Sequence, residues 1–553
     1  MDRELFAAAG DWMAVDPDPD TRAEVEALIA AGDEAGLADR FGDRLTFGTA
    51  GLRGEVAAGP NRMNRVVVRQ AAGALGRRLP AASLVVIGFD ARHKSDVFAT
   101  DTAEVLAAQG HRAQILPGPL PTPVLAHAVL ACGAAAGVMV TASHNPPADN
   151  GYKVYWGDGA QIVPPVDAEI EAEILAGGLP PLETGPPADG GGIERVGDQA
   201  IAGYVEAIAG ALPGPAVEDL VVAYTPLHGV GEATLRRVFV ATGLDDPRPT
   251  PSQARPDPDF PTVSFPNPEE PGAMDAVMAA ADEAGAHLVV ANDPDADRLA
   301  VAVQTPDGWR ALRGDEIGTL LAHHLLSGLS ALDRDRWAVA TTLVSSSLLS
   351  KLAAAAGVTY VETLTGFKWI ARAGDASGRR LLFGYEEALG YAVSDVVRDK
   401  DGISAAVVFV RLAAALHAEG RSPLDLLDDI YRDHGVHLTG QATLRFADID
   451  IARDKIAGYR ADPPAEIAGV AVDRRVDHLS DPPEGMIPAD AIVVWLADGT
   501  RVAVRPSGTE PKLKTYIEVV VAVADGDLAA AHSVAQSRLD AVAAAMKQRF
   551  GGH

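Results

Sequence analysis

The sequence contains a triplet of aspartates at alternate positions: Asp293, Asp295 and Asp297. An apolar run at 287–292 precedes them, so they fall in a loop at the end of a predicted strand. Alternating carboxylates in such a loop can converge on one hard cation, which prefers oxygen ligands. An EF-hand is excluded, because Arg298 and Gln304 occupy the positions that require Gly and Glu. A solvated acidic turn gives the same pattern, and the triplet alone does not separate these two interpretations.

A second candidate is Ser143, in the sequence TASHNPPADNGYK at 141–153. A serine at a strand end, followed by His, Asn and paired prolines, predicts a rigid turn that presents its hydroxyl outward. The G-x-S-x-G elbow of hydrolases is absent, because Ala142 and His144 flank the serine. Taken alone, these residues are also typical of a serine that only caps a turn and of a surface lysine, Lys153.

Two glycine-containing loops carry an arginine and small hydroxyl residues: GTAGLRG at 48–54 and RPSGTEPK at 505–512. Backbone N–H groups, hydroxyls and a bidentate Arg form a suitable cradle for a phosphate group. Neither loop is a Walker motif, since G-x-x-x-x-G-K-[ST] does not occur. A third loop, GYEEALGY at 384–391, places two carboxylates beside glycines, a pattern that also fits the start of a helix.

Short apolar runs rich in β-branched residues predict the strands that position these loops. They lie at 84–90, 137–143, 220–226, 287–292 and 337–347. Ala- and Leu-rich helical stretches separate many of them, and this alternation indicates α/β units with a mostly parallel sheet. Ligands usually bind at the carboxyl ends of such strands, where the serine and aspartate motifs lie.

After about residue 440 the pattern changes and predicts a smaller α+β domain. The segment 491–506 predicts a hairpin with Asp498 and Gly499 in its turn. A further strand at 515–523 precedes an Ala-rich helix. The predicted domains are residues 1–211, 212–312, 313–440 and 441–553.

Three segments between these elements have an unusual composition. The segment 113–148 contains no Asp, Glu, Lys or Arg. A membrane helix needs about twenty predominantly apolar residues, and prolines break this segment up too much, so we expect a buried helix that feeds a buried strand. Composition predicts a flexible surface loop at 177–192, and a long Pro-rich connection at 247–272 of the kind that is either disordered or functional.

The bulk composition is that of a globular protein, and its 553 residues are too many for one core. The net charge of −29 argues against a nucleic-acid partner, whose backbone such a surface would repel. A single cysteine, Cys132, excludes an internal disulfide and a Cys-rich zinc site. The N-terminal residues contain no apolar run long enough for a signal peptide. We therefore expect a cytoplasmic protein that binds neither nucleic acid nor membrane.

Four motifs, in this order, resemble the active-site loops of the α-D-phosphohexomutase superfamily: TASHNPPADNGYK, NDPDADR, GYEEALGY and RPSGTEPK. Four more resemble its longer branch, which includes bacterial phosphoglucomutase- and phosphomannomutase-type enzymes and phosphopentomutase-like ones: LTFGTAGLRG, TPLHGVG, FPNPEEP and TLTGFKWI. The resemblance implies three α/β domains with mixed or parallel sheets and a smaller C-terminal α+β domain around a central cleft. It also implies that the C-terminal domain closes over this cleft.

By this resemblance, Ser143 carries a phosphoryl group, and Mg²⁺ is held by Ser143 and the three aspartates, Asp293, Asp295 and Asp297. A phosphoserine bears nearly two negative charges, so the carboxylates would repel it unless a cation lay between them. The resemblance puts Arg298 near the transferred phosphoryl group. It makes Arg53 and Lys153 the cations that face phosphate and handle the proton, and the sequence does not decide which of the two takes it.

The resemblance also implies which residues bind the substrate. The phosphate that does not react is held by a clamp of four residues: Arg505, Ser507, Gly508 and Thr509. In the sugar loop, Glu386 contacts sugar hydroxyls and Ala388 lies close by. The other substrate-binding positions are Thr49, His144, Gly366 and Lys368. His144 in addition supports the serine loop.

The sugar loop departs from the common family pattern, G-E-x-S-G-H. Residues 386–391 read E-E-A-L-G-Y, with Ala for Ser, one inserted residue and Tyr for His. Loss of a hydroxyl and an imidazole changes which sugar hydroxyls can be held. This loop type also resembles the phosphopentomutase-like branch. We favour a hexose, glucose or mannose, with ribose and deoxyribose phosphates as the alternative.

The predicted activity is a mutase that interconverts hexose 1-phosphate and hexose 6-phosphate through a phosphoserine and a sugar 1,6-bisphosphate. The alternatives are a phosphopentomutase, a sugar 1,6-bisphosphate synthase, a phosphatase and an inactive sugar-phosphate sensor. A phosphatase needs no second phosphate clamp, and a sensor is expected to have lost Ser143 or an aspartate. The expected partner is a small-molecule sugar phosphate, bound by a monomer or homodimer.

Overall fold

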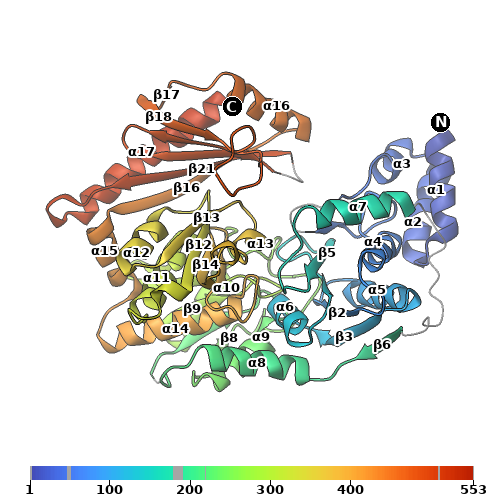
Figure 1. The fold of residues 1–553 in the computed structure, drawn as a ribbon, viewed down its shortest axis with the longest axis horizontal. Helices are drawn as coiled ribbons and strands as arrows, with labels where there is room; N and C mark the ends of the chain where they lie inside the picture. The colour runs from blue at the N-terminus through green and yellow to red at the C-terminus, as the bar shows by residue number, and fades with distance from the viewer. Residues whose placement is uncertain (1–2, 47–50, 178–190, 218, 508–510, 552–553) are drawn as a thin grey trace. The chain divides into compact units, whose positions relative to one another are not determined.

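The computed structural model describes residues 3–46, 51–177, 191–217, 219–507 and 511–551. The chain divides into two compact units (Figure 1). The first is Met1–Leu312 with Gly390–Ala414, and the second is Arg313–Leu389 with Ala415–His553. The described residues form four sheets, in agreement with the predicted four-domain α/β architecture.

The first sheet is mixed and has the strand order β1-β5-β4-β2-β3-β6. Its strands are β1 (Leu52–Glu55), β2 (Leu84–Phe89), β3 (Arg112–Pro119), β4 (Ala136–Val140), β5 (Asp149–Trp156) and β6 (Gly192–Arg195). The apolar strands β2 and β4 pair in parallel and are buried, as expected of a sheet covered by helices. The covering helices are α4 (Arg65–Arg78), α5 (Ser95–Ala108), α6 (Thr122–Ala131) and α7 (Val166–Gly177).

The strands predicted at 84–90 and 137–143 are confirmed as β2 and β4. The uncharged segment 113–148 contains the predicted buried helix, α6, followed by the buried strand β4. It also contains most of β3, which was not predicted because Pro117 and Pro119 interrupt its apolar run. Residues 178–190 of the predicted flexible loop lie outside the described residues.

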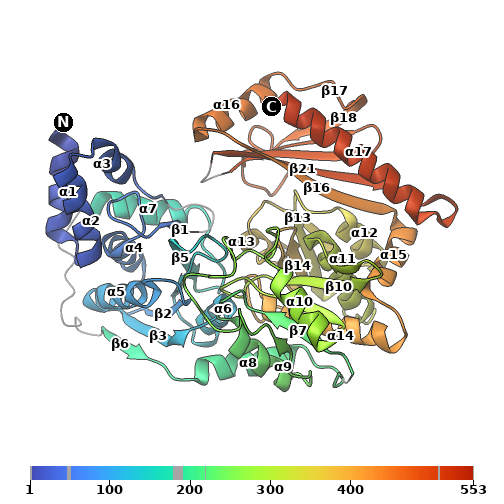
Figure 2. The ribbon, with the colours of Figure 1, turned by 180° about the vertical axis from the view of Figure 1, so that it is seen from behind.

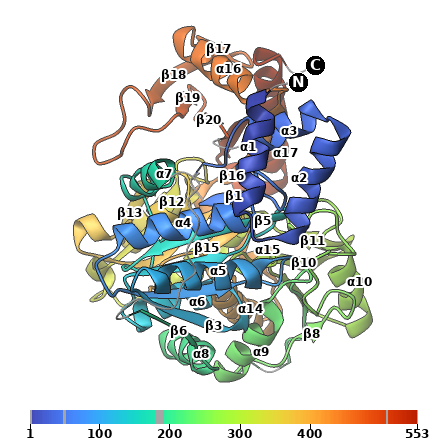
Figure 3. The same ribbon diagram turned by 90° about the vertical axis from the view of Figure 1, so that its right-hand side faces the viewer.

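Three N-terminal helices pack together and against the core of the first sheet (Figure 3). They are α1 (Arg3–Val15), α2 (Pro19–Ala31) and α3 (Glu34–Phe41). Their buried side chains include Trp12, Val25 and Leu37, each at most 1% exposed. These helices therefore extend the core of the first sheet.

The second sheet belongs to the first unit and has the order β11-β10-β9-β7-β8. Its strands are β7 (Val222–Thr225), β8 (Arg248–Pro249), β9 (Leu288–Ala291), β10 (Ala300–Thr305) and β11 (Gly308–Ala311). Strands β7 and β9 confirm the predictions at 220–226 and 287–292. Nearby helices are α8 (Gln199–Ala211), α9 (Gly231–Ala241) and α10 (Asp275–Ala284). The Pro-rich connection 247–272 forms β8 and a series of ordered turns.

The third sheet contains β13 (Thr359–Thr363), β12 (Trp337–Thr342) and β14 (Arg380–Glu386) in this spatial order, all parallel. Helices α11 (Gly314–Ser327), α12 (Leu348–Ala356) and α13 (Phe367–Ile370) accompany it. Strand β12 confirms the first part of the run predicted at 337–347. The alternative of a helix start at 384–391 is wrong, because β14 continues through Glu386. Two more elements follow: β15 (Gly390–Ala392) and α14 (Gly402–Ala418).

The fourth sheet is antiparallel, with the order β16-β21-β20-β19-β18-β17. Its strands are β16 (Val436–Arg445), β17 (Glu466–Ile467), β18 (Val470–Asp477), β19 (Ile492–Leu496), β20 (Arg501–Pro506) and β21 (Lys512–Val521). The long helix α17 (Leu528–Arg549) lies along β16 and β21 (Figure 2). Along the chain, α15 (Pro423–His434) precedes β16, and α16 (Ile449–Ala461) connects β16 to β17. The predicted hairpin is confirmed as β19 and β20, with Gly499 at φ 85° in the turn.

The third and fourth sheets share a small apolar core within the second unit. Three of its residues directly follow strands of the third sheet: Leu343 and Val344 after β12, and Leu364 after β13. The others lie in or next to strands of the fourth sheet, and all are at most 8% exposed: Ala491, Val493, Ala503 and Tyr516. Burial of apolar side chains on both sides stabilises this contact. Strands β14 and β20 therefore belong to one compact unit.

Over the described ranges, no single helix has the length and apolar character needed to cross a membrane. Helices α14 and α15 pass that test only as a pair, and they meet at a bend of 91°.

Candidate active site

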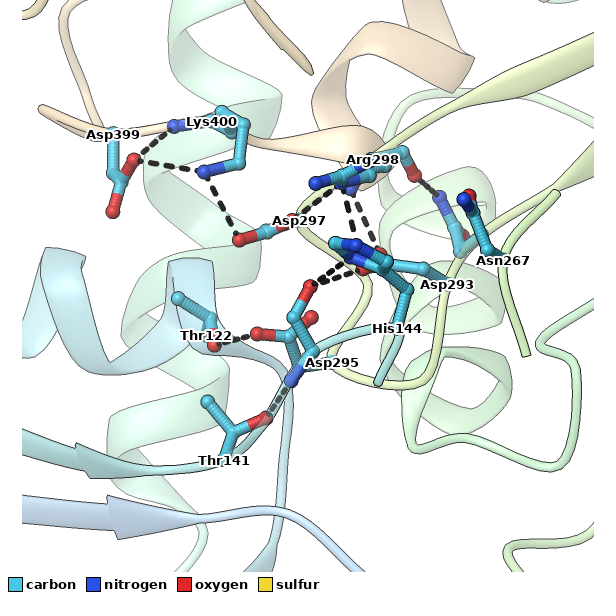
Figure 4. Close-up of polar contacts among 12 residues, drawn as sticks. Thr122, Thr141, His144, Asn267, Asp293, Asp295, Asp297, Arg298, Asp399 and Lys400 are labelled. Atoms are coloured by element: carbon cyan, nitrogen blue, oxygen red, sulfur yellow. Dashed lines mark hydrogen bonds and ion pairs between the residues drawn. The ribbon is translucent and has the colours of Figure 1, made fainter. Parts of the chain in front are cut away.

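The aspartate triplet lies in the short connection between β9 and β10, which are antiparallel neighbours. Asp293, Asp295 and Asp297 are each 0% exposed. One carboxylate oxygen of each lies within 4.8 Å of the others, in the only such group among the described residues. The alternative of a solvated acidic turn is therefore wrong, since all three carboxylates are buried together (Figure 4).

Two glycines allow backbone segments to approach this loop closely. A Cβ at Gly229 would lie 2.3 Å from the Pro294 Cα atom, and the neighbouring Val230 N–H donates to the Pro294 carbonyl at 2.9 Å. A Cβ at Gly402 would lie 2.1 Å from the Arg298 carbonyl oxygen. Only glycine fits either position. The sequences TPLHGVG and RDKDG therefore both pack directly against the backbone of the loop that carries the three aspartates.

The three carboxylates are electrostatically incomplete by themselves. Burial, together with the negative charges of Asp295 and Asp297, holds the pKa of Asp293 well above its usual range. The Oδ1 atoms of Asp295 and Asp297 are buried and accept no hydrogen bond from any described residue. A hard divalent cation would supply the missing positive charge and use these oxygens as ligands. The donor set therefore fits such a cation.

Ser143 lies beside this triplet although the two are far apart in the sequence. Its Oγ donates a hydrogen bond of 2.7 Å to Asp293 Oδ2 and lies 3.1 Å from His144 Nδ1. The serine is 3% exposed and has a left-handed backbone with φ 52°. The end of β4 therefore brings the Ser143 hydroxyl into contact with the carboxylates. A serine that only caps a turn would not need this contact.

Three cationic side chains surround the triplet (Figure 4 labels two of them, Arg298 and Lys400). Lys153 Nζ donates to Asp295 Oδ2 at 2.8 Å and to Asp297 Oδ2 at 3.0 Å. Arg298 Nε lies 4.0 Å from Asp297 Oδ1, and Lys400 Nζ lies 3.3 Å from Asp297 Oδ2. Burial disfavours the charged forms of Lys153, Asp295 and Asp297, but their mutual attraction outweighs this effect. The pKa of Lys153 is therefore raised, and the pKa values of Asp295 and Asp297 are lowered.

His144 and Arg53 lie close to the serine. Burial, reinforced by the positive charges of Arg298 and Arg53, holds the pKa of His144 well below its usual range. The imidazole is therefore neutral near pH 7. Arg53 extends from β1 and donates to Asn145 Oδ1 at 2.9 Å, within the serine loop. Burial lowers the pKa of Arg53, although guanidinium groups stay protonated in proteins.

The sequence did not indicate two side chains that contact the triplet. Thr122, at the start of α6, donates its hydroxyl to Asp295 Oδ2 at 2.7 Å. Lys400 belongs to the sequence RDKDG, whose charges stand out in an otherwise apolar stretch, and this was the signal that could have found it. Its neighbour Asp399 accepts hydrogen bonds from Tyr155 and Gln161 at 2.6 and 2.7 Å.

The second unit carries the described residues of the predicted sugar loop and phosphate clamp. Glu386 Oε1 accepts a hydrogen bond of 2.8 Å from the Gly366 N–H, and Gly366 has φ 109°, a conformation that favours glycine. Lys368 is buried, with Nζ 5.8 Å from the centre of the Trp369 ring. Ala388 is half-buried in the sugar loop. The sugar loop thus contacts the TLTGFKWI segment through the hydrogen bond between Glu386 and Gly366.

Sequence reasoning also missed Glu387, the neighbour of Glu386. The Ser345 hydroxyl donates to Glu387 Oε2 at 2.8 Å, and the Glu387 N–H donates back to Ser345 Oγ at 3.2 Å. Burial and the negative charge of Glu386 raise the pKa of Glu387 to about 7.

Arg505 lies in β20 and Ser507 directly follows it, and the Ser507 N–H donates to the Lys512 carbonyl at 2.8 Å. Three predicted substrate-binding positions, Thr49, Gly508 and Thr509, lie outside the described residues. The structure therefore brings together Ser143, the triplet, Lys153, Arg298 and His144 in the first unit. It brings Glu386 to Gly366 in the second.

Four family models match the chain in sequence order. They are described as phosphoglucomutase/phosphomannomutase alpha/beta/alpha domains I, II and III and the C-terminal domain of the same enzymes. The matched residues are 44–179, 202–308, 313–434 and 454–532.

Curated relatives carry several names. A probable phosphomannomutase of Haemophilus influenzae is 44% identical over 82% of this chain and 93% of its own. A phosphopentomutase of Mus musculus is 34% identical over 95% of this chain and 92% of its own. A glucose 1,6-bisphosphate synthase of Homo sapiens is 32% identical over 98% of this chain and 94% of its own.

A solved structure has the same fold. The phosphoglucomutase/phosphomannomutase family protein of Burkholderia thailandensis superposes with a TM-score of 0.67 and 22% identity, covering 91% of this chain and 96% of its own.

Proposed function

The chain belongs to the phosphoglucomutase/phosphomannomutase family of the α-D-phosphohexomutase superfamily and is a phosphomutase, and from this premise we propose that it interconverts hexose 1-phosphate and hexose 6-phosphate. The observation that supports the proposal most is the 2.7 Å hydrogen bond from Ser143 Oγ to Asp293 Oδ2 in a buried carboxylate cluster. A serine that carries a phosphoryl group next to a divalent cation requires this proximity.

We propose Mg²⁺ as the cation, held by Asp293, Asp295, Asp297 and the oxygen on Ser143. The support is the all-oxygen donor set and the two buried Oδ1 atoms that accept no hydrogen bond from the described residues. When bound, the ion would neutralise the phosphoserine and draw negative charge from the transferring phosphoryl group.

In the proposed reaction, phosphorylated Ser143 gives its phosphoryl group to the free hydroxyl of a hexose monophosphate. The oxygen–phosphorus bond at Ser143 breaks, a new bond to the sugar oxygen forms, and the proton of the sugar hydroxyl ends on the released Ser143 oxygen. The product is a hexose 1,6-bisphosphate, which turns end for end and returns its other phosphoryl group to Ser143. The protonated Lys153 and Arg298 stabilise the charge on the transferring oxygens.

We propose that the phosphate group that does not react is bound by Arg505, Ser507, Gly508 and Thr509. Glu386 would accept hydrogen bonds from sugar hydroxyls, with Gly366 fixing its carboxylate. Energy gained at these remote contacts holds the reacting hydroxyl in line with Ser143. The remaining members of the proposed binding set are Thr49, His144, Lys368 and Ala388.

The experiment compares glucose, mannose, N-acetylglucosamine and ribose 1-phosphates as substrates, with Mg²⁺ and trace glucose 1,6-bisphosphate. We expect the highest kcat/KM for glucose or mannose 1-phosphate, and no turnover by Ser143→Ala. A preference for ribose 1-phosphate would overturn the hexose assignment and leave the mutase reaction in place. Turnover by Ser143→Ala at the wild-type rate would overturn the phosphoserine mechanism.

A phosphopentomutase is the second candidate. It is favoured by Ala388, which removes a sugar-contacting hydroxyl from the common loop pattern, and by the coverage of relatives. The mouse phosphopentomutase matches 95% of this chain, whereas the Haemophilus influenzae phosphomannomutase matches 82%. A bisphosphate synthase would release the bisphosphate without net isomerisation, so measured bisphosphate accumulation separates it from both mutases.

We also propose that the enzyme works in the cytoplasm as a monomer or homodimer. The support for the location is the single cysteine, Cys132, which is compatible with a reducing compartment. Light scattering of the purified protein measures the mass of the assembly, and a larger oligomer would contradict this proposal.

A further inference from the structure

Arg92 follows strand β2 and has no role in the mechanism described above. Its side chain is 1% exposed, and its guanidinium points into the loop that carries Ser143. One terminal nitrogen, Nη1, donates to the Pro146 carbonyl at 2.7 Å and the Asp149 carbonyl at 3.0 Å. The other, Nη2, donates to the Ser143 carbonyl at 2.8 Å and to the Asn145 carbonyl. A single side chain therefore joins the beginning and the end of this loop.

The loop needs such support because of the backbone at Ser143. Its φ of 52° is left-handed, which an L-residue with a Cβ adopts only at a cost in free energy. Such a conformation persists where surrounding contacts over-determine it. Within the loop, the Ser143 N–H donates to Thr141 Oγ1 at 2.9 Å and the Asn145 N–H donates to the Ala142 carbonyl at 3.1 Å. Arg92 supplies the contact on the carbonyl side of Ser143.

The guanidinium is flanked by a carboxylate and by an aromatic ring. Asp90 Oδ2 lies 3.5 Å from Arg92 Nε, in an ion pair without a hydrogen bond. Asp90 Oδ1 accepts hydrogen bonds from the backbone N–H of Arg92 at 3.0 Å and from Ser95 Oγ at 2.7 Å. The ring of Phe260 lies 4.9 Å from Arg92 Cζ and is 2% exposed. Phe260 belongs to the Pro-rich connection 247–272 of the second sheet. This segment therefore supports the serine loop of the first sheet indirectly, by packing against Arg92.

We propose that Arg92 is a positioning residue for phosphoryl transfer: it holds the strained Ser143 backbone so that Oγ points at the aspartate triplet. The proposal rests on the proposed function, since it concerns the rate at which Ser143 gains and loses a phosphoryl group. Four carbonyls are matched by the planar fork of Arg, whereas Lys offers a single ammonium at one point. A misplacement of about 1 Å at a reacting atom can reduce a rate by roughly 10²-fold.

The test measures phosphorylation of Ser143 by glucose 1,6-bisphosphate, together with kcat and KM, in Arg92→Lys. We expect the phosphorylation rate and kcat to fall by about 100-fold, with KM little changed, because the proposed phosphate clamp and sugar loop are formed by other segments. For Arg92→Ala, added guanidinium chloride at non-denaturing concentration should restore part of the rate. Wild-type phosphorylation rates in Arg92→Lys would overturn the proposal.

A matched control is Arg69→Lys. Arg69 is another buried arginine near the first sheet, and its Nε donates to Asp101 at 2.8 Å, away from the serine loop. This variant should lose thermal stability and keep its kcat. Equal losses of kcat in Arg69→Lys and Arg92→Lys would reduce the effect to general destabilisation and contradict the proposal.

If Arg92→Lys does not fold, the variant Phe260→Leu tests the positioning role of Arg92 instead. This change keeps the guanidinium and its hydrogen bonds but removes the aromatic face on which it rests. We expect kcat to fall by about tenfold at unchanged KM, and an unchanged kcat would refute the positioning role. Failure of the wild type to isomerise any sugar would instead refute the proposed function, while the phosphorylation rate of Ser143 would still test Arg92.

Discussion

Replacing Glu518 with Gln is predicted to destabilise the second unit and to weaken substrate binding. Glu518 lies on β21, is 3% exposed, and meets a loop of the third sheet. Its Oε1 accepts hydrogen bonds from Ser346 Oγ at 2.8 Å and from the Ser347 N–H at 2.7 Å. His437 Nδ1 lies 3.1 Å from the same oxygen, and Arg501 Nη2 lies 3.1 Å from Oε2.

The magnitude follows from the pKa of Glu518. Burial raises it, but Arg501 and His437 outweigh burial and lower the pKa from 4.5 to about 2. This difference corresponds to about 3 kcal/mol of stability at pH 7. Because the folded-state pKa is depressed, this stability is fully present above pH 4.5 and is lost as the pH falls towards 2. Gln keeps the shape of the side chain, so the variant removes mainly the charge and leaves Arg501 buried.

Hydrogen exchange of the β21 amides measures this stability locally, without requiring the whole chain to unfold in one step. At pH 7 the free energy of opening should be about 3 kcal/mol lower in Glu518→Gln than in the wild type. The matched control is Glu362→Gln, because Glu362 is 34% exposed and lies 3.5 Å from the same arginine. Its effect should stay below about 1 kcal/mol. Equal effects of the two variants, or none at Glu518, would refute the reasoning.

The same cluster reaches the sugar loop. Arg501 Nη2 donates to the Ser345 carbonyl, and Ser345 Oγ donates to Glu387 Oε2 at 2.8 Å, next to Glu386. Loss of the Glu518 charge should therefore disturb this loop and raise KM for the sugar phosphate several-fold, with a smaller effect on kcat. Steady-state kinetics of the two variants measures both.

Three further predictions concern the metal, a lysine and a carboxyl group. EDTA should abolish turnover and lower the Tm, and Mg²⁺ should restore both; in Asp295→Asn, scanning fluorimetry should detect no Mg²⁺-dependent Tm difference. Lys400→Met should lower kcat by about 10²-fold, because Lys400 Nζ lies 3.3 Å from Asp297; an unchanged kcat would exclude a role in the reaction. Burial and Glu386 raise the pKa of Glu387 to about 7, so its favourable contribution is present below pH 4.5 and lost as the pH rises through 7. Exchange of β14 amides should accordingly quicken, beyond the intrinsic pH effect, between pH 5 and 8 in the wild type, and Glu387→Gln should remove this excess.

The sequence predicted the parts of the fold that depend on local patterns. The runs that became β2, β4, β7 and β9 are apolar and β-branched, and their ends place the serine and aspartate motifs correctly. Strand β3 was missed because prolines disguise its pattern. A strand end predicts a loop, but not that Glu386 would continue β14 and face the Gly366 amide.

Most contacts between distant segments could not be predicted from sequence patterns. Thr122 and Lys400 both touch the triplet, yet neither stands in a spacing that marks a ligand, and only the charges of RDKDG single out Lys400. Arg92 was missed for the same reason, since four backbone carbonyls leave no mark in the identity of the residues that carry them. The burial of the triplet, which separates a metal loop from a solvated turn, also appears only when the β9–β10 connection packs against Gly229 and Gly402.

The proposed reaction depends on Ser143 as the carrier of the transferred phosphoryl group. It is tested most directly by the intact mass and peptide map of the protein after treatment with glucose 1,6-bisphosphate and Mg²⁺. We expect one added phosphoryl group, located on Ser143, that leaves when hexose 6-phosphate is added and reappears in hexose 1,6-bisphosphate. A phosphoryl group on another residue, or none while the sugar phosphates still interconvert, would contradict it.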